Sequence, residues 1–330
     1  MSTARTSWRS LLLAGILAAV LLYFAFSGVD WDRLLSKLSE ARPFEIGIVF
    51  CAYTISYFGR ACRWGVLLSA ERWIAPITMF WATIVGYLAN DFLPARAGEL
   101  IRTAMLSRRT GINIGFVLAT ALTERIVDAA VLVTISMVAL AVVTALPPEL
   151  TVATRAMAVV GVAGVCGLLV APQLAPLFRA ILRRLPISTT LLERLIGSME
   201  RFLLGLKAIQ HPGRASGFLT LTAIIWIIDT FAAIFTARSL GLELSIAQAL
   251  ILIAALGLSS AAPSTPGYVG IYQAVAVAVL VPFGFLQADA LAFILLFQAI
   301  TYVVVMVWGA PALWRLSLMP TLVQAMPEPK

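Results

Sequence analysis

Residues for metal and thiol chemistry are rare in this chain of 330 amino acids. It contains one histidine, His211, and three cysteines, Cys51, Cys62 and Cys166. The histidine lies beside Pro212 at the foot of a predicted helix, so we expect neither a His-based metal site nor a Ser/His/Asp triad. The cysteines lie in apolar stretches without a CxxC pair, so we expect packing thiols and no disulfide framework. The P-loop motif GxxxxGK(S/T) is also missing. We therefore expect no metal, no cofactor and no enzymatic activity.

Charge is scarce as well. Only 12% of the residues are charged and 61% are hydrophobic, whereas soluble domains carry about 25% charged residues. The mean hydropathy is +0.97, and apolar segments recur that are long enough to cross a hydrocarbon core of about 30 Å. No long polar stretch remains from which a separate soluble domain could be built. The composition predicts an all-α integral membrane protein with one polytopic membrane domain over residues 1–330.

The N-terminal segment resembles both a signal peptide and a membrane anchor. Arg5 and Arg9 precede the apolar run 11–26. This run is longer than the core of a typical signal peptide, and no clear small-x-small cleavage site accompanies it. We expect an uncleaved anchor helix, with a cleaved signal peptide as the alternative.

The distribution of basic residues predicts the orientation. Seven Lys or Arg lie between Arg179 and Arg214 against two Glu, which by the positive-inside rule places this loop in the cytoplasm. No aromatic platform interleaves the charges, as a nucleic-acid-binding surface would require. Within the segment 177–214, Thr190 and Glu193 fit a capping box, and apolar residues follow at helical spacing. We expect an amphipathic helix along the cytoplasmic membrane surface; docking against the helix bundle is the alternative.

Two stretches with Pro and Gly, residues 94–99 and 266–270, interrupt apolar runs at corresponding places in the two halves. Broken helices at membrane depth persist only where protein or a water-filled cavity supplies hydrogen-bond partners. In transporters, such paired interruptions point to the substrate site. We interpret each stretch as the turn of a re-entrant helical hairpin.

About six full transmembrane helices complete the predicted topology. They are expected at residues 8–26, 44–68, 114–144, 153–170, 218–238 and 291–308, with a short loop after the first. The hairpins cover 76–109, opening to the cytoplasm, and 246–280, opening outward. Repeat A (44–144) and repeat B (218–308) then each contain helix, hairpin and helix in opposite orientations, which is an inverted-topology repeat. Both termini lie in the cytoplasm.

Ionisable residues within the apolar runs are candidates for a binding site, because a charge at the bilayer centre costs about 2.5–3.5 kcal/mol on insertion scales. Glu124, Arg125 and Asp128 share one helix face, and Glu124 lies near the midplane. The alternative to ligand binding is an internal pair of Arg125 with Asp128 that fixes helix packing. Asp229 either carries a proton or serves as the counter-ion of an arginine.

Arginines near the first interruption suit an anion. Arg96 lies in the turn, where a guanidinium can hold a phosphate bidentately, and Glu99 and Arg102 follow at i, i+3 spacing. Arg60 and Arg63 lie in the last third of their helix. For Arg96, Arg60 and Arg63, extension of the side chain to the membrane interface is the alternative to ligand binding.

The second interruption offers neutral polar groups. Ser264 and Thr265 carry hydroxyls beside Pro266 and Gly267, and Tyr268, Tyr272 and Gln273 follow. The N-terminal amides of the emerging helix favour an anion. The alternative is that these groups only satisfy backbone freed by the break. Asn90 and Pro94, at the first interruption, complete the candidate substrate-binding set.

Four elements of the sequence resemble a known family. Asn90-x-x-Leu-Pro94-x-Arg96-x-Gly-Glu99-x-x-Arg102 resembles a signature of the flippase-like family that includes the membrane half of lysyl-phosphatidylglycerol synthases. The other three are Glu124-Arg125-x-x-Asp128, Arg60-x-x-Arg63-Trp64 and Pro263-x-x-Pro266-Gly267-x-x-Gly270, and together the four span residues 55–273. The family often has an acidic residue where this chain has Gln273. We expect no aminoacyl-transferase domain after Lys330, so the resemblance implies lipid translocation without lysyl transfer.

These observations lead to the hypothesis of a lipid flippase in the bacterial inner membrane for a lipid with an anionic, phospho- or polyprenyl-phosphate-type head group. The arginines would compensate the phosphate, and the carboxylates would balance them in the empty site or couple transport to protons. The alternatives are a membrane-embedded transferase on a lipid-linked substrate, with Glu124 or Asp128 as base, and a non-transporting subunit of a lipid-modifying complex. Expected partners are the lipid, the membrane, and either a lipid-modifying enzyme or a second copy of the chain, but not nucleic acid.

Overall fold

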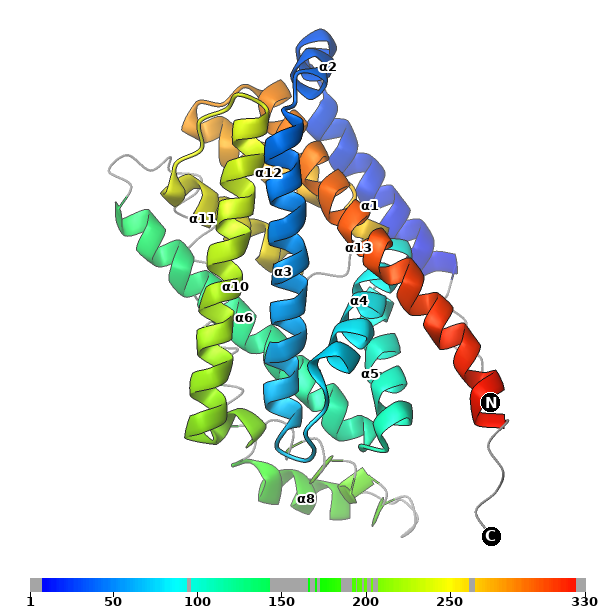
Figure 1. Ribbon diagram of the computed structural model, residues 1–330. Helices are drawn as coiled ribbons and strands as arrows, with labels where there is room; N and C mark the ends of the chain where they lie inside the picture. The colour runs from blue at the N-terminus through cyan, green and yellow to red at the C-terminus, as the bar shows by residue number, and fades with distance from the viewer. Residues whose placement is uncertain are drawn as a thin grey trace.

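The computed structural model describes residues 8–93, 96–142, 173–184, 207–260 and 265–324, with isolated residues between 166 and 203. Every regular element among them is a helix, which confirms the all-α prediction (Figure 1). By length and composition, three of the described helical segments can cross a membrane: Pro212–Ser239, Pro266–Phe283 and Gln287–Trp314. Pro94, Ser264 and all but isolated residues of the predicted helix 153–170 lie outside the described residues.

The first half of the chain follows the predicted order of helices. The helices are α3 (Pro43–Leu68), α4 (Pro76–Phe92), α5 (Ala97–Thr110) and α6 (Ile114–Val142). Pro43 and Pro76 open α3 and α4, because proline lacks the N–H that the first helical turn leaves unpaired. Gly111 ends α5 with φ 74°, the left-handed conformation that glycine adopts without cost. The α4–α5 hairpin begins at the end of the molecule where α3 ends (Figure 1).

The second half repeats this order from the opposite end (Figure 1). Its elements are α10 (Pro212–Ser239), α11 (Ile246–Ser259), η3 (Pro266–Tyr268), α12 (Ile271–Leu280), η4 (Val281–Phe283) and α13 (Gln287–Gln324). A capping box of Ser245 and Gln248 opens α11. The predicted end of the last helix at residue 308 is wrong, because α13 continues through Pro311. Proline is tolerated inside a membrane helix where neighbouring groups satisfy the freed carbonyl.

The predicted loop after α1 (Trp8–Phe26) is also wrong, since residues Trp31–Ser39 form helix α2. Asp30 caps it by accepting a hydrogen bond from the Arg33 amide at 3.0 Å. Arg33 joins α2 to the start of α13 through two 2.9 Å hydrogen bonds to Asp289. The hydrogen bonding to Asp289 and the negative charge of its carboxylate raise the pKa of Arg33 above its ordinary value. The first two helices are thereby attached to the last.

Helix α8 (Ala175–Arg184) lies across the end of the bundle where α3 ends and α10 begins (Figure 1). Arg179 of α8 forms an ion pair with Glu200. Most of the predicted surface helix 190–207 lies outside the described residues. The expectation of packed thiols is wrong for Cys51 and Cys166, which are exposed.

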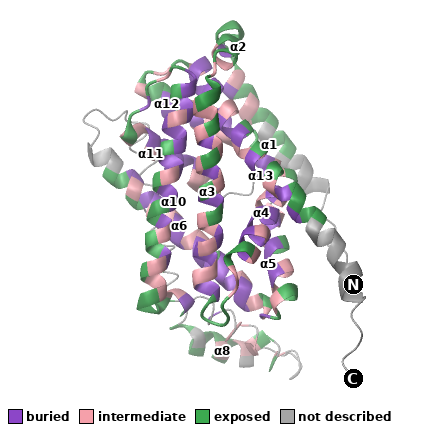
Figure 2. Ribbon diagram, in the orientation of Figure 1, coloured by how far each residue is buried: buried purple, intermediate pink, exposed green. Residues whose placement is uncertain are grey.

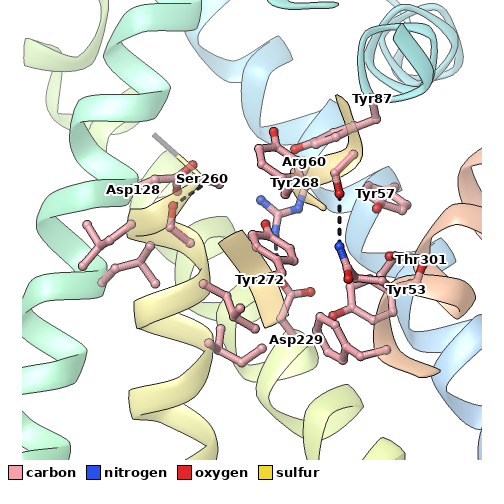
Figure 3. Close-up of a pocket in the computed structure, with 18 of the residues that line it drawn as sticks. Tyr53, Tyr57, Arg60, Tyr87, Asp128, Asp229, Ser260, Tyr268, Tyr272 and Thr301 are labelled. Carbon is pink, nitrogen blue, oxygen red and sulfur yellow. Dashed lines mark hydrogen bonds and ion pairs between the residues drawn. The ribbon is translucent and has the colours of Figure 1, made fainter. Parts of the chain in front are cut away.

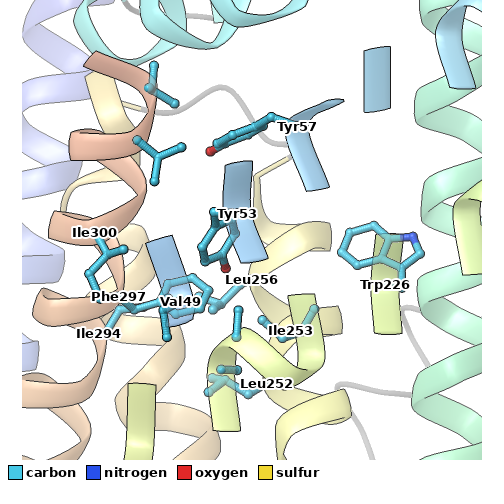
Figure 4. Packing of buried hydrophobic residues seen from close by; sticks show 14 of the residues in the cluster. Val49, Tyr53, Tyr57, Trp226, Leu252, Ile253, Leu256, Ile294, Phe297 and Ile300 are labelled. Atoms are coloured by element: carbon cyan, nitrogen blue, oxygen red, sulfur yellow. The ribbon is translucent and has the colours of Figure 1, made fainter. Parts of the chain in front are cut away.

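Buried side chains from both halves form one continuous apolar core (Figure 2). Helices α3 and α10 pack side by side along much of their length. Val49 and Tyr53 of α3 meet Leu252 of α11 and Phe297 of α13 within this core (Figure 4). Because each half of the chain contributes to the same core, the two interruptions are held at fixed positions relative to each other.

Two glycines allow α4 and α5 to approach closely. Gly98 is buried, its N–H donates to Asn90 Oδ1 at 2.9 Å, and a Cβ there would overlap the carbonyl oxygen of Gly86. A Cβ on Gly86 would in turn press on the Arg102 side chain. Small residues at such contacts let helix backbones pack tightly in membranes.

Substitution Gly98→Ala should therefore destabilise the protein strongly. Overpacking of a tight contact costs about 1–3 kcal/mol or more, so we expect a clear fall in the thermal unfolding midpoint in detergent. Gly47→Ala on α3 is the matched control, because a Cβ there meets no atom within 4 Å. The control should be neutral or slightly stabilising, since alanine favours helices. Equal midpoints for the two variants would contradict the close contact.

Candidate functional site

The two interrupted stretches meet in the interior of the molecule. Arg96 precedes α5 in the left-handed conformation, with φ 56° and ψ 36°, and its Nη1 donates to the Ser260 carbonyl at 2.7 Å. On the other side, η3 packs against α4, and Gly267 has φ 63°. The Gly267 carbonyl accepts hydrogen bonds from the Tyr302 hydroxyl and from Gln298 Nε2. The second turn is therefore fixed to α13, and the first to the end of α11.

An ion-pair network surrounds this meeting point. It comprises four arginines and three carboxylates from α3, the first turn, α5 and α6: Arg63, Arg96, Arg102, Arg125, Glu99, Glu124 and Asp128. With all groups ionised, its formal charge is four minus three, or +1. Charges removed from water require such partners.

Arg63 and Arg102 lie deepest in the network. The Arg63 guanidinium contacts both Asp128 oxygens at 2.5 and 2.9 Å and Glu124 Oε1 at 3.2 Å, and its side chain is 2% exposed. Arg102 bridges Glu99 at 2.6 Å and Glu124 at 3.0 Å. It also stacks over the Trp64 ring, 4.4 Å from the ring centroid. Their guanidinium groups are satisfied by protein atoms, so these residues act as scaffold.

Glu99 connects the turn to α6. Its carboxylate contacts Arg125 at 2.5 Å, Arg102 at 2.6 Å and Arg96 at 3.4 Å. The alternative pair of Arg125 with Asp128 is much looser, at 4.0 Å. The intrahelical pairing is therefore secondary, and Arg125 is directed mainly to Glu99.

Arg60 and Asp229 form a separate ion pair between α3 and α10. Ser56 Oγ donates to the second Asp229 oxygen at 2.6 Å, and the Arg60 guanidinium lies over the Trp226 ring, 5.2 Å from its centroid. The Arg60 side chain is 12% exposed and that of Asp229 5%. Asp229 is thus the counter-ion of Arg60. This was one of the two interpretations offered by the sequence, the other being a proton carrier.

A cavity of about 170 Å³ lies between the two turns (Figure 3). Of the predicted site residues, Arg60, Arg96, Arg125, Asp128, Asp229 and Gly267 line it. The other described candidates lie around it without lining it: Arg63, Asn90, Glu99, Arg102, Glu124, Thr265, Pro266 and Gln273. Among the described residues, no group of His, Cys, Asp or Glu could hold a metal ion.

Several supporting candidates satisfy the broken backbone. Asn90 accepts from the Gly98 amide, and Gln273 accepts from the Gly270 amide at 2.7 Å. Gln273 Nε2 also donates to Gln298 Oε1 at 2.5 Å, and Thr265 Oγ1 donates to the Val269 carbonyl at 2.6 Å. At Thr265 and Gln273, the hydrogen bonds therefore match the alternative interpretation, in which these side chains satisfy backbone groups freed by the break.

Unpaired polar atoms of the cavity-lining residues carry the strongest chemical signal. Arg96 Nε, Arg125 Nε and Trp226 Nε1 are buried donors with no acceptor among the described residues. Asp91 Oδ2 is a buried acceptor to which none of the described residues donates a hydrogen bond. A buried polar atom left unpaired costs about 1–3 kcal/mol. A ligand with anionic oxygens would satisfy the three donors.

Comparison with known proteins places the chain in a family. Residues 11–309 match the family described as the lysylphosphatidylglycerol synthase TM region. The chain belongs to this family. The resemblance of its motifs is thereby confirmed, and its apolar helices are those of a multi-pass membrane protein. The chain is also similar to the glycosyltransferase AglD of Haloferax volcanii, with 25% identity over 98% of the chain, which spans 57% of that relative's length.

Sequence reasoning missed part of the cavity wall of this lysylphosphatidylglycerol synthase TM-region protein. The missed polar or aromatic residues are Tyr53, Tyr57, Tyr87, Asp91, Trp226, Ser260, Phe297, Gln298, Thr301 and Tyr302. Their spacing held a usable signal, because Tyr53, Tyr57 and Arg60 follow at i, i+4 and i+7 and so share one helix face. Tyr87 and Asp91 repeat the i, i+4 spacing on α4.

The Arg60–Asp229 pair can be tested by a double-mutant cycle. Asp229→Asn leaves the Arg60 charge buried without its partner, which should cost about 3–5 kcal/mol of unfolding free energy. The double variant Arg60→Gln/Asp229→Asn removes both charges and should recover a large part of this loss. Thermal or denaturant unfolding in detergent measures both. Additive effects of the two substitutions would show that the pair is not coupled.

Proposed function

We propose that this protein is a flippase-like transporter that moves a lipid with an anionic head group across the membrane. The observation that carries the proposal is the set of three unpaired N–H donors, on Arg96, Arg125 and Trp226, around a cavity where the two interrupted stretches meet. Phosphate oxygens are acceptors only, and arginine holds them with charge-assisted hydrogen bonds.

The arrangement of the helices supports an inverted-topology repeat within the membrane. In this proposal, six helices span the bilayer, and the α4–α5 and α11–α12 hairpins enter from opposite faces. Half-helix ends then converge near the midplane, which is where transporters of this architecture bind substrate. We place the protein in a bacterial inner membrane, with both termini and the segment containing α8 on the cytoplasmic side.

The ion-pair network suggests how a head group could be accepted. The network carries a formal +1, and Glu99 contacts both Arg96, at 3.4 Å, and Arg125, at 2.5 Å. An entering phosphate would compete with Glu99 for these two arginines while the lipid tails remain in the hydrocarbon. The deeper pairs of Arg63 and Arg102 would keep the helices in place during this exchange.

Arg96→Gln and Arg125→Gln should each abolish most transport. Loss of one charge-assisted hydrogen bond costs about 1.5–3 kcal/mol, so the rate should fall about tenfold or more. The measurement is the translocation of acyl-labelled phosphatidylglycerol in reconstituted vesicles, followed by chemical quenching of the outer leaflet. Arg179→Gln on α8 is the control, because Arg179 pairs with Glu200 and does not line the cavity.

The same assay separates the alternatives. Normal transport in both cavity variants, with protein amounts and unfolding midpoints unchanged, would refute the role of these arginines. The relative AglD is a glycosyltransferase by name, which makes a membrane-embedded transferase the second candidate. That candidate requires a modified lipid to form when purified protein is incubated with a lipid-linked sugar donor. A non-transporting subunit of a lipid-modifying complex, or a partner copy of the chain, would instead be recovered with its partner after gentle extraction.

A further inference from the structure

The cavity wall is unusually rich in tyrosine. Six tyrosines line it, Tyr53, Tyr57, Tyr87, Tyr268, Tyr272 and Tyr302, and they come from both halves of the chain (Figure 3). The Tyr302 hydroxyl donates to the Gly267 carbonyl. The hydroxyls of the other five make no hydrogen bond with any described residue. If these tyrosines served packing alone, phenylalanine could take their places without loss, because a buried hydroxyl is unfavourable unless it is hydrogen-bonded.

A phosphate group does not match all of the unpaired atoms. Its oxygens would satisfy the donors of Arg96, Arg125 and Trp226, but Asp91 Oδ2 needs a donor. The ligand must therefore bring hydrogen-bond donors as well as anionic oxygens. Hydroxyl groups and ammonium groups both meet this requirement.

The charges of the cavity favour hydroxyls over an ammonium group. Three arginines line it, Arg60, Arg96 and Arg125, while Asp229 and Asp128 are already paired with Arg60 and Arg63. Asp91 alone would face the added cation within a cavity of about 170 Å³. Hydroxyls add no charge, and they can both donate and accept, as the five free tyrosine hydroxyls can.

The aromatic rings add a shape argument. The rings of Tyr268 and Tyr272 stack nearly parallel, with centroids 5.0 Å apart and an interplanar angle of 10°. A flat aromatic surface packs well against the C–H face of a saturated six-membered ring. The cavity also exceeds by far the roughly 10–15 Å³ that one water molecule needs, so it has room for such a ring.

We propose that the transported head group is a phosphate ester of a cyclic polyol, such as a sugar, with the phosphate on Arg96 and Arg125 and the polyol between the tyrosines and Asp91. This inference rests on the proposed function and adds the class of head group to it. It assigns Tyr268, Tyr272 and Asp91 as specificity-determining residues.

The test compares three acyl-labelled lipids in reconstituted vesicles. Phosphatidylinositol carries a phosphate and a cyclic polyol, phosphatidate carries phosphate alone, and phosphatidylethanolamine carries phosphate and ammonium. We expect phosphatidylinositol to move about tenfold faster than the other two, because only it pairs the donors, Asp91 and the tyrosine hydroxyls together. Equal rates for phosphatidylinositol and phosphatidate, or the fastest movement for phosphatidylethanolamine, would overturn the inference and leave the anionic-lipid flippase intact.

Variants separate this inference from the proposed function. Tyr272→Phe and Asp91→Asn should each remove most of the preference for phosphatidylinositol over phosphatidate. Tyr23→Phe on α1, where the side chain is exposed, is the matched control and should change nothing. Unchanged preference in both cavity variants, with normal unfolding midpoints, would refute the assigned roles. If none of the three lipids moves and Arg125→Gln equals the parent protein, the proposed function itself fails.

Discussion

The arrangement of the site depends on one carboxylate, that of Glu99, which binds three guanidinium groups. Arg96 comes from the first turn, Arg102 from α5 itself and Arg125 from α6. A charge in a low-dielectric interior must be paired, so this single group determines where a turn, a hairpin helix and a long helix lie relative to one another. The glycine contact between α4 and α5 brings Glu99 to the required depth, and the pairs of Arg63 and Arg102 hold α3 and α6 around it.

The two halves have similar helix order but contribute different chemistry. The arginines of the ion-pair network and Arg60 all belong to the first half, whereas the second half provides Asp229 and neutral groups such as Tyr272 and Gln298. Both turns nevertheless share one feature, a residue in the left-handed conformation that is hydrogen-bonded to another part of the bundle. Arg96 donates to the Ser260 carbonyl, and the Gly267 carbonyl accepts from Tyr302. A scaffold of this kind can place charge on one wall of a cavity and hydroxyls on the other.

The sequence predicted elements whose signals are local and left out those that depend on tertiary contacts. Apolar runs bounded by Pro and Gly gave the limits of α3 to α6 closely, and charges within these runs identified the buried arginines and carboxylates. Helix α2 was missed because its polar residues suggested a loop, although Asp30 provided a capping signal. The preference of Asp128 for Arg63 over Arg125 could not be found from spacing, because it arises from the packing of α3 against α6.

The attachment of α2 to α13 also bears on how the chain assembles. Arg33 and Asp289 are 256 residues apart, so their hydrogen bonds close a loop that contains nearly every other helix. Contacts of such long range form late, since the ends of a long loop meet only after the intervening segments have become ordered. During synthesis the N-terminal helices therefore remain without this partner until the last helix has entered the bilayer, and its docking completes the fold.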